Sequence, residues 1–210
     1  MEQFIRYVVL VHAALGSLAL IAGLISILAK KGDNLHKKSG VLFKWSMIFS
    51  GVIAMVVTLL PNHENSFLFA IGIFSLYFVV TGNRALRFKS EISTLFWDKI
   101  IAWVMIIASV GMVFGPILIS SVINIVLVVF AIVGGVFAVR DLLLFKNAQR
   151  LQQNWLKLHL GKMFGAYISA TTAFIVANQI IPGIYGWLLP GAVGAIVITH
   201  FMRRLKNGKL

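Results

Sequence analysis

The sequence contains no cysteine, and only 12% of its 210 residues are charged. The absence of cysteine excludes disulfide bonds, thiolate catalysis, iron–sulfur clusters and zinc sites with cysteine ligands. An ordinary soluble domain has about 25% charged residues, so this chain has too little polar surface for that class. The GxxxxGK[ST], GxGxxG, GxSxG and HExxH motifs are also absent, which removes the common signals for phosphate loops, dinucleotide sites, serine hydrolases and zinc proteases.

Apolar residues make up 60% of the chain instead, and the mean hydropathy is +0.94. This composition predicts an all-α integral membrane protein in which residues 1–210 form one helical bundle. A helix needs about 20 apolar residues to cross the hydrocarbon layer. Seven runs meet this need, with a helix break expected at Gly115-Pro116 because proline cannot donate a backbone hydrogen bond. The runs cover residues 5–29, 41–60, 67–88, 98–115, a fifth run ending near 145, 156–181 and 184–205.

Basic residues greatly outnumber acidic ones, 19 to 6, and give a net charge of +13. They flank the apolar runs, so we expect them to orient the protein and to contact anionic lipid rather than nucleic acid. If the N-terminus lies outside the cytoplasm, seven spans place every Lys and Arg except Arg6 on the cytoplasmic side. An even number of spans would destroy this asymmetry. The charges therefore predict seven helices with a cytoplasmic C-terminus.

Small residues recur at helical spacing in the first run, where His12, Gly16, Ala19 and Gly23 share one face. Such faces let transmembrane helices approach closely, so His12 is expected to point at a neighbouring helix. Two roles remain open for it: a neutral histidine hydrogen-bonded across the bundle, or a functional group.

One face of the sixth run carries side chains that could contact a ligand. At 100° per residue they fall within an arc of about 120°; they are His159, Met163, Tyr167, Thr171 and Asn178. The pattern predicts a ligand pocket or a proton path, and the alternative is a set of hydrogen bonds between helices, each worth about 0.6 kcal/mol.

Tyr77 and Arg84 share a face of the third run near the predicted inner surface and are further candidates for ligand binding. Asp98, Arg140 and Asp141 are expected near the same surface. An ion pair between an arginine and an aspartate is the simpler explanation for these charges.

Three histidines, His36, His159 and His200, are expected at the cytoplasmic ends of their helices. Imidazole is the commonest metal ligand, so the three together with Asp98 or Asp141 could hold zinc. Two histidines at one depth on separate helices could instead bind haem iron. Histidines are also ordinary residues at membrane interfaces, where they contact lipid phosphate.

Several short motifs follow one another along the chain: His12-x3-Gly16, Lys31-Gly32-x3-His36, Thr81-Gly82-x-Arg84, Trp155-x3-His159-x3-Met163-x3-Tyr167 and Trp187-Leu188-Leu189-Pro190. Together they resemble a family of bacterial multi-pass inner-membrane proteins of unknown function. The resemblance covers nearly the whole chain, although Lys37 stands where the family usually has arginine. It implies a location in the bacterial inner membrane but no activity, substrate or cofactor.

Three functions are compatible with these residues. The first is a bundle that binds a small hydrophobic ligand or haem b, with His12, His159 and His200 as key groups. The second is a zinc-dependent intramembrane lipid hydrolase with His36, His159 and His200 as ligands and Asp98 or Asp141 assisting. The third is a small transporter or a lipid-interacting structural protein.

Overall fold

The computed structural model describes residues 2–90 and 94–208, and this part of the chain forms seven long α-helices joined by short connections. A short 3₁₀-helix, η1, extends the third of them. The elements are α1 (Glu2–Leu28), α2 (Asn34–Val57), α3 (Ser66–Arg84), η1 (Ala85–Lys89), α4 (Phe96–Ser120), α5 (Ile125–Leu144), α6 (Ala148–Ala177) and α7 (Gly183–Lys206).

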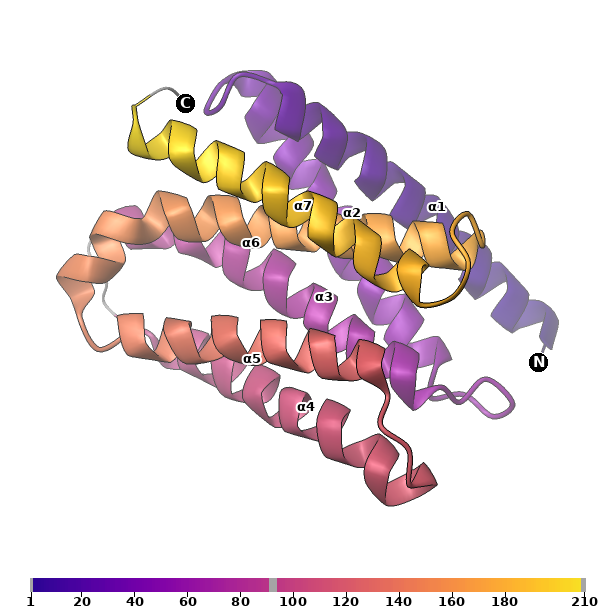
Figure 1. The fold of residues 1–210 in the computed structure, drawn as a ribbon. Coiled ribbons are helices and arrows are strands. Elements are labelled where there is room, and N and C mark those ends of the chain that lie inside the picture. The colour runs from indigo at the N-terminus through magenta and orange to yellow at the C-terminus, as the bar shows by residue number, and fades with distance from the viewer. Residues whose placement is uncertain (1, 91–93, 209–210) are drawn as a thin grey trace.

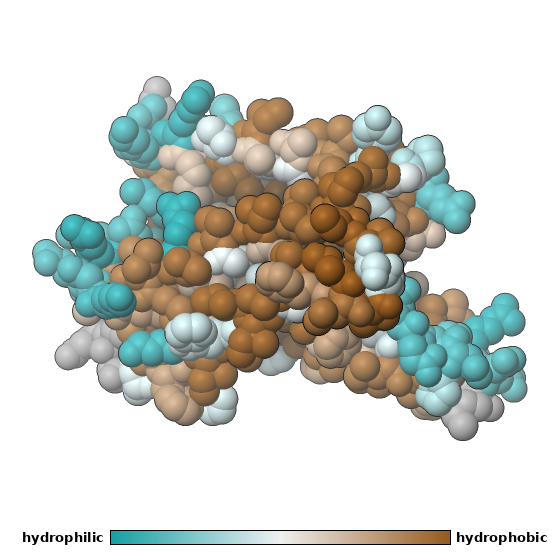
Figure 2. Space-filling view, turned by 60° about the horizontal axis from the view of Figure 1, so that its bottom comes forward, coloured by the Kyte–Doolittle hydropathy of each residue, from teal (hydrophilic) through white to brown (hydrophobic). Residues whose placement is uncertain are grey.

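Each long helix, α3 being counted together with η1, is long and apolar enough to cross a membrane. They contain 20 to 30 residues, which at 1.5 Å per residue corresponds to about 30–45 Å. Apolar side chains form a belt across the middle of the molecule, and hydrophilic side chains gather at its two ends (Figure 2). Large apolar residues such as Ile107 and Ile196 are about 70% exposed, as expected for side chains that face lipid. The predicted seven-span fold is therefore confirmed.

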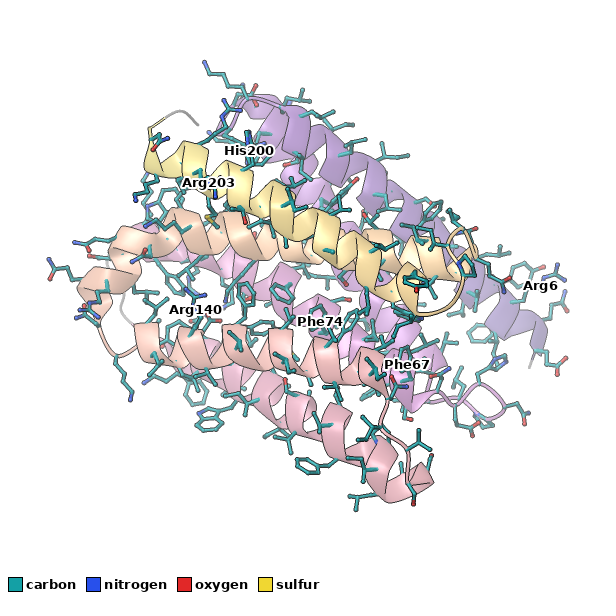
Figure 3. The ribbon with its side chains drawn as sticks, viewed as in Figure 1. Arg6, Phe67, Phe74, Arg140, His200 and Arg203 are labelled. Carbon is teal, nitrogen blue, oxygen red and sulfur yellow. The ribbon has the colours of Figure 1, made fainter. Side chains whose placement is uncertain are left out.

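Helices α3 and α6 pack against each other at the centre of the bundle (Figure 1). The α1–α2 hairpin lies on one side of this pair, where α2 packs against α3. The α4–α5 hairpin lies on the other side and also packs against α3, while α7 runs along α6. The two termini lie at opposite ends (Figure 1). Arg6 lies at the end that holds the N-terminus, whereas Arg140 and Arg203 lie toward the other end (Figure 3). We call these the N-terminal end and the basic end.

The predicted helix break at Gly115-Pro116 is wrong, because α4 continues through Pro116 to Ser120. Proline removes only its own backbone donor, and the next residues can still bond to carbonyls one turn back; the Ser121 amide donates to Ile117 O at 2.9 Å. The helix ends where Ser121 adopts a left-handed conformation with φ of 54°. Helix α5 then begins at the Asn124 cap, whose side chain accepts a hydrogen bond from Leu127 N.

Small residues allow neighbouring helices to lie close together, as the pattern of small residues in the first apolar run predicted. Ala19 is fully buried, and a Cβ atom at Gly23 would lie 2.5 Å from the Tyr167 ring. A Cβ atom at Gly165 of α6 would lie 2.6 Å from the ring of Phe78 on α3. At these positions only glycine fits the observed spacing of the helices.

Candidate functional site: a buried charge cluster at the basic end

Three ionisable side chains from three helices meet inside the bundle. The Tyr77 hydroxyl of α3 donates a hydrogen bond of 2.7 Å to Asp141 Oδ2 of α5. The Lys162 ammonium of α6 forms an ion pair with the same carboxylate oxygen and lies 5.1 Å from the centre of the Tyr77 ring. All three residues are at most 3% exposed. We call this group the Asp141 cluster.

A second ion pair lies beside the Asp141 cluster and joins the end of α3 to the start of α4. Arg84 donates from Nε to Asp98 Oδ1 and from Nη2 to Asp98 Oδ2, both at 2.7 Å. Such a bidentate pair fixes both side chains. Asp98 is buried, and Lys162 is close enough to it for their charges to interact. The expected Arg–Asp pair is confirmed for Arg84 and Asp98, whereas Asp141 pairs with Lys162.

The two ion pairs bring two positive and two negative charges into the bundle, so together they are formally neutral. Charges are costly inside a membrane and need partners there. Among the described residues, no buried polar side-chain atom lacks a hydrogen-bond partner. Pairing offsets the cost of desolvation without making the charges a strong source of stability, since a buried ion pair is often no better than apolar side chains of equal volume.

Polar contacts continue from the cluster along the interface of α3 and α6. Thr81 donates to the backbone carbonyl of Tyr77, and Ser75 and Ser169 share a hydrogen bond between the two helices. Beyond the Tyr77–Asp141 hydrogen bond, aromatic rings pack across the α3–α5 interface. Phe74, which lies inside the bundle (Figure 3), packs edge-on against Phe78 and Phe130 with ring centres 4.8 and 4.7 Å apart. We call these three rings, together with Phe137, the aromatic layer.

His159 and His12 bind to neighbouring helices. His159 Nδ1 lies 2.9 Å from the carbonyl of Gly82 on α3, and since a carbonyl can only accept, this nitrogen carries the proton. His12 Nδ1 likewise donates to Ser50 O at 2.9 Å, and the Ser50 hydroxyl donates back to His12 O. Of the two roles open for His12, the structure therefore shows the hydrogen bond across the bundle.

His36 stabilises the end of α1. Its Nδ1 donates to Ser26 O, one of the last carbonyls of that helix, and the Lys31 ammonium donates to Ser26 O and Ile27 O. Carbonyls in the last turn have no partner within the helix, so these two side chains cap it. Burial, together with the positive charge of Arg204, lowers the pKa of Lys31 from its ordinary value of 10.5.

The three histidines expected to share a metal do not form such a group. Among the described residues, no three His, Cys, Asp or Glu side chains are placed to hold one ion. His36 and His159 bind backbone carbonyls, and the His200 ring packs edge-on against Phe201. The structure therefore offers no support for the three-histidine zinc site, and haem binding stays a prediction.

The predicted stripe on α6 divides between several environments. Met163 contacts Gly82 and Tyr167 contacts Gly23, so both fill spaces between helices. The Thr171 and Asn178 side chains donate to carbonyls of their own helix, one turn back, and Asn178 is exposed. A ligand-binding role for these residues stays a prediction.

Lys162 is the residue that the sequence interpretation missed, because it was counted among the basic residues at the membrane surface. Two signals could have identified it. It lies inside the sixth apolar run, and Asp141 lies at a similar depth in the preceding antiparallel run.

Comparison with protein families, curated proteins and solved structures finds no match to this chain. The resemblance to a bacterial inner-membrane family stays a prediction.

Proposed function

We propose that this integral membrane protein is a small proton-linked transporter that takes up and releases a proton at Asp141. The observation that supports this is the meeting of a carboxylate, an ammonium and a phenol inside membrane-spanning helices. Ionisable residues within membrane spans are costly, and where they occur they commonly belong to proton relays or substrate paths.

The charge balance of the cluster couples protonation to structure. When Asp141 is ionised, it holds Lys162 and Tyr77 and so ties α5 to α6 and α3. A proton from water at the basic end neutralises the carboxylate and leaves the Lys162 charge without its counterion. That state is unfavourable in a low-dielectric interior, so proton uptake favours either a movement of Lys162 or the entry of an anion.

The aromatic layer supports a transport cycle in which access alternates. Its rings fill the α3–α5 interface on the side of Asp141 that faces the N-terminal end. Exchange of a proton with that end therefore requires α3 and α5 to separate. On the other side the Arg84 side chain is partly exposed, so a proton can reach the cluster from water at the basic end.

The location and partners belong to the same proposal. The basic end faces the cytoplasm and contacts anionic lipid, and the membrane is the bacterial inner membrane. The charge distribution supports this orientation, because every described Lys and Arg except Arg6 lies in a connection at that end or in the half of its helix nearer to it. Lys209 lies outside the described residues.

The experiment measures protonation and transport on the purified full chain. Infrared difference spectra recorded on acidification should show a carboxylic acid C=O band that Asp141→Asn removes. In liposomes with a trapped pH dye and an imposed membrane potential, the native protein should carry protons inward. Asp141→Asn should abolish this flux, and Asp141→Glu should retain part of it.

Asp33→Asn is the matched control, because Asp33 is an aspartate that caps α2 outside the cluster. This variant should keep both the band and the flux. The proposal fails if the native protein lacks either signal, since Asp141 would then be a permanently ionised structural residue or would exchange protons without moving them.

A further inference from the structure

A cavity of about 750 Å³ lies at the N-terminal end, far from the Asp141 cluster. The α4–α5 connection, the first turn of α5, the end of α6 and the start of α7 surround it. Thirteen described residues line it, and none is Lys, Arg, Asp or Glu. Its volume falls within the range of about 300–1,000 Å³ that is typical of small-molecule sites.

Aromatic and aliphatic side chains form the interior of this cavity. Phe67 of α3 and Trp187 of α7 both line it and pack edge-on, with ring centres 4.9 Å apart. Val126 and Val176 line it from α5 and α6. Polar groups come mainly from the two connections and include the amide of Gln179, an exposed residue with a left-handed backbone at φ of 51°.

The surface next to the cavity is apolar and exposed. Leu118 is 83% exposed and Ile119 is 79% exposed, at the end of α4, while Ile123 is 66% exposed and lines the cavity itself. In a membrane span, such side chains face hydrocarbon. Ile123 therefore presents an exposed apolar side chain at the cavity itself, close in the chain to the exposed apolar end of α4, and a molecule dissolved in the bilayer can approach the cavity along these side chains.

We infer that this cavity binds an uncharged amphiphile from the membrane, with its apolar tail against Phe67 and Trp187 and its polar head near Gln179. None of the described lining residues carries a positive charge that could pair with a phosphate, so an uncharged head is favoured over an anionic one. The inference does not depend on proton transport, because the two sites share no residue.

The test uses tryptophan fluorescence in the full chain. One variant keeps Trp187 and a second keeps Trp103, the other tryptophans being replaced by phenylalanine; Trp103 lies on α4, is 55% exposed and does not line the cavity. Both are reconstituted in phosphatidylcholine vesicles with increasing brominated monoacylglycerol, which quenches tryptophan on contact. Quenching of Trp187 should saturate at a mole fraction about tenfold lower than that of Trp103, which corresponds to about 1.4 kcal/mol of preferential binding.

A filled cavity provides the second measurement. Val176→Phe should make Trp187 respond like Trp103, whereas Val133→Phe on the exposed face of α5, away from the cavity, should leave the saturation unchanged. Equal quenching of the two tryptophans in the unfilled protein overturns the inference. Saturation by brominated phosphatidylglycerol at the same low mole fraction overturns the preference for an uncharged head.

Discussion

Breaking the Lys162–Asp141 ion pair should cost far more than replacing both of its members. Lys162→Met leaves the Asp141 carboxylate about 98% buried with only the Tyr77 hydroxyl as a partner. Removing one member of a buried pair typically costs about 3–5 kcal/mol, whereas replacing the whole pair is often neutral. We expect each of Lys162→Met and Asp141→Asn to cost about 3 kcal/mol or more, and the double variant to cost less than either one alone.

The free energy of unfolding can be measured by SDS titration of the full chain in mixed micelles, followed by circular dichroism. Lys157→Met is the control, because Lys157 is an exposed lysine on the same helix and surface changes of this kind usually stay within about 0.5 kcal/mol. Additive losses in the double variant would refute the reasoning, since they would show that the two side chains do not interact. A Lys162→Met variant as stable as the control would also refute it.

Two further predictions concern packing and titration. Gly165→Ala should destabilise the protein by about 1–3 kcal/mol because its Cβ would overlap the buried Phe78 ring, whereas Gly111→Ala, which meets no atom within 4 Å, should be neutral or stabilising in the same SDS titration. Arg204→Gln should raise the pKa of Lys31 because it removes a like charge. In the native protein the lowered pKa means that a charged Lys31 disfavours folding, so the free energy of unfolding rises as the pH increases towards 10.5 and Lys31 loses its proton. This rise should be smaller in the variant, because the penalty for charging Lys31 is smaller. NMR titration of ¹³C-dimethylated lysine measures this pKa, and an unchanged value would contradict the prediction.

The number of helices could be predicted from the sequence because it depends on local quantities. Apolar runs are long enough to cross hydrocarbon, and the cost of leaving backbone groups unpaired in lipid makes each run helical. The position of Pro116 shows the limit of this reasoning. A proline near the end of a helix removes one hydrogen bond, and the end itself is set by the left-handed Ser121 and by the Asn124 cap.

The rotation of each helix about its axis was harder to predict, because it depends on all the neighbours at once. On α6 the sequence suggested a face that includes His159 and Asn178, but the α3 contacts are made by Lys162, Gly165 and Ser169 as well. Lys162 is three positions from His159, which is about 60° around the helix. A transmembrane helix carries apolar residues on every side, so its hydrophobic pattern does not reveal which side faces the bundle. The interpretation therefore depended on the polar positions alone, and Lys162 was assigned to the surface.

The aromatic layer connects the two ends of the molecule by direct contacts. Phe130 of α5 packs against Phe74 of α3 and also against Trp187 of α7, with ring centres 4.7 and 6.4 Å apart. Asp141 lies about 16 Å further along the same helix. A movement of the whole of α5 that releases Asp141 from Lys162 would also move Phe130 against Trp187 in the cavity wall. Because coupling between binding sites is reciprocal, an amphiphile that favours one position of Trp187 would favour one protonation state of Asp141 by the same free energy.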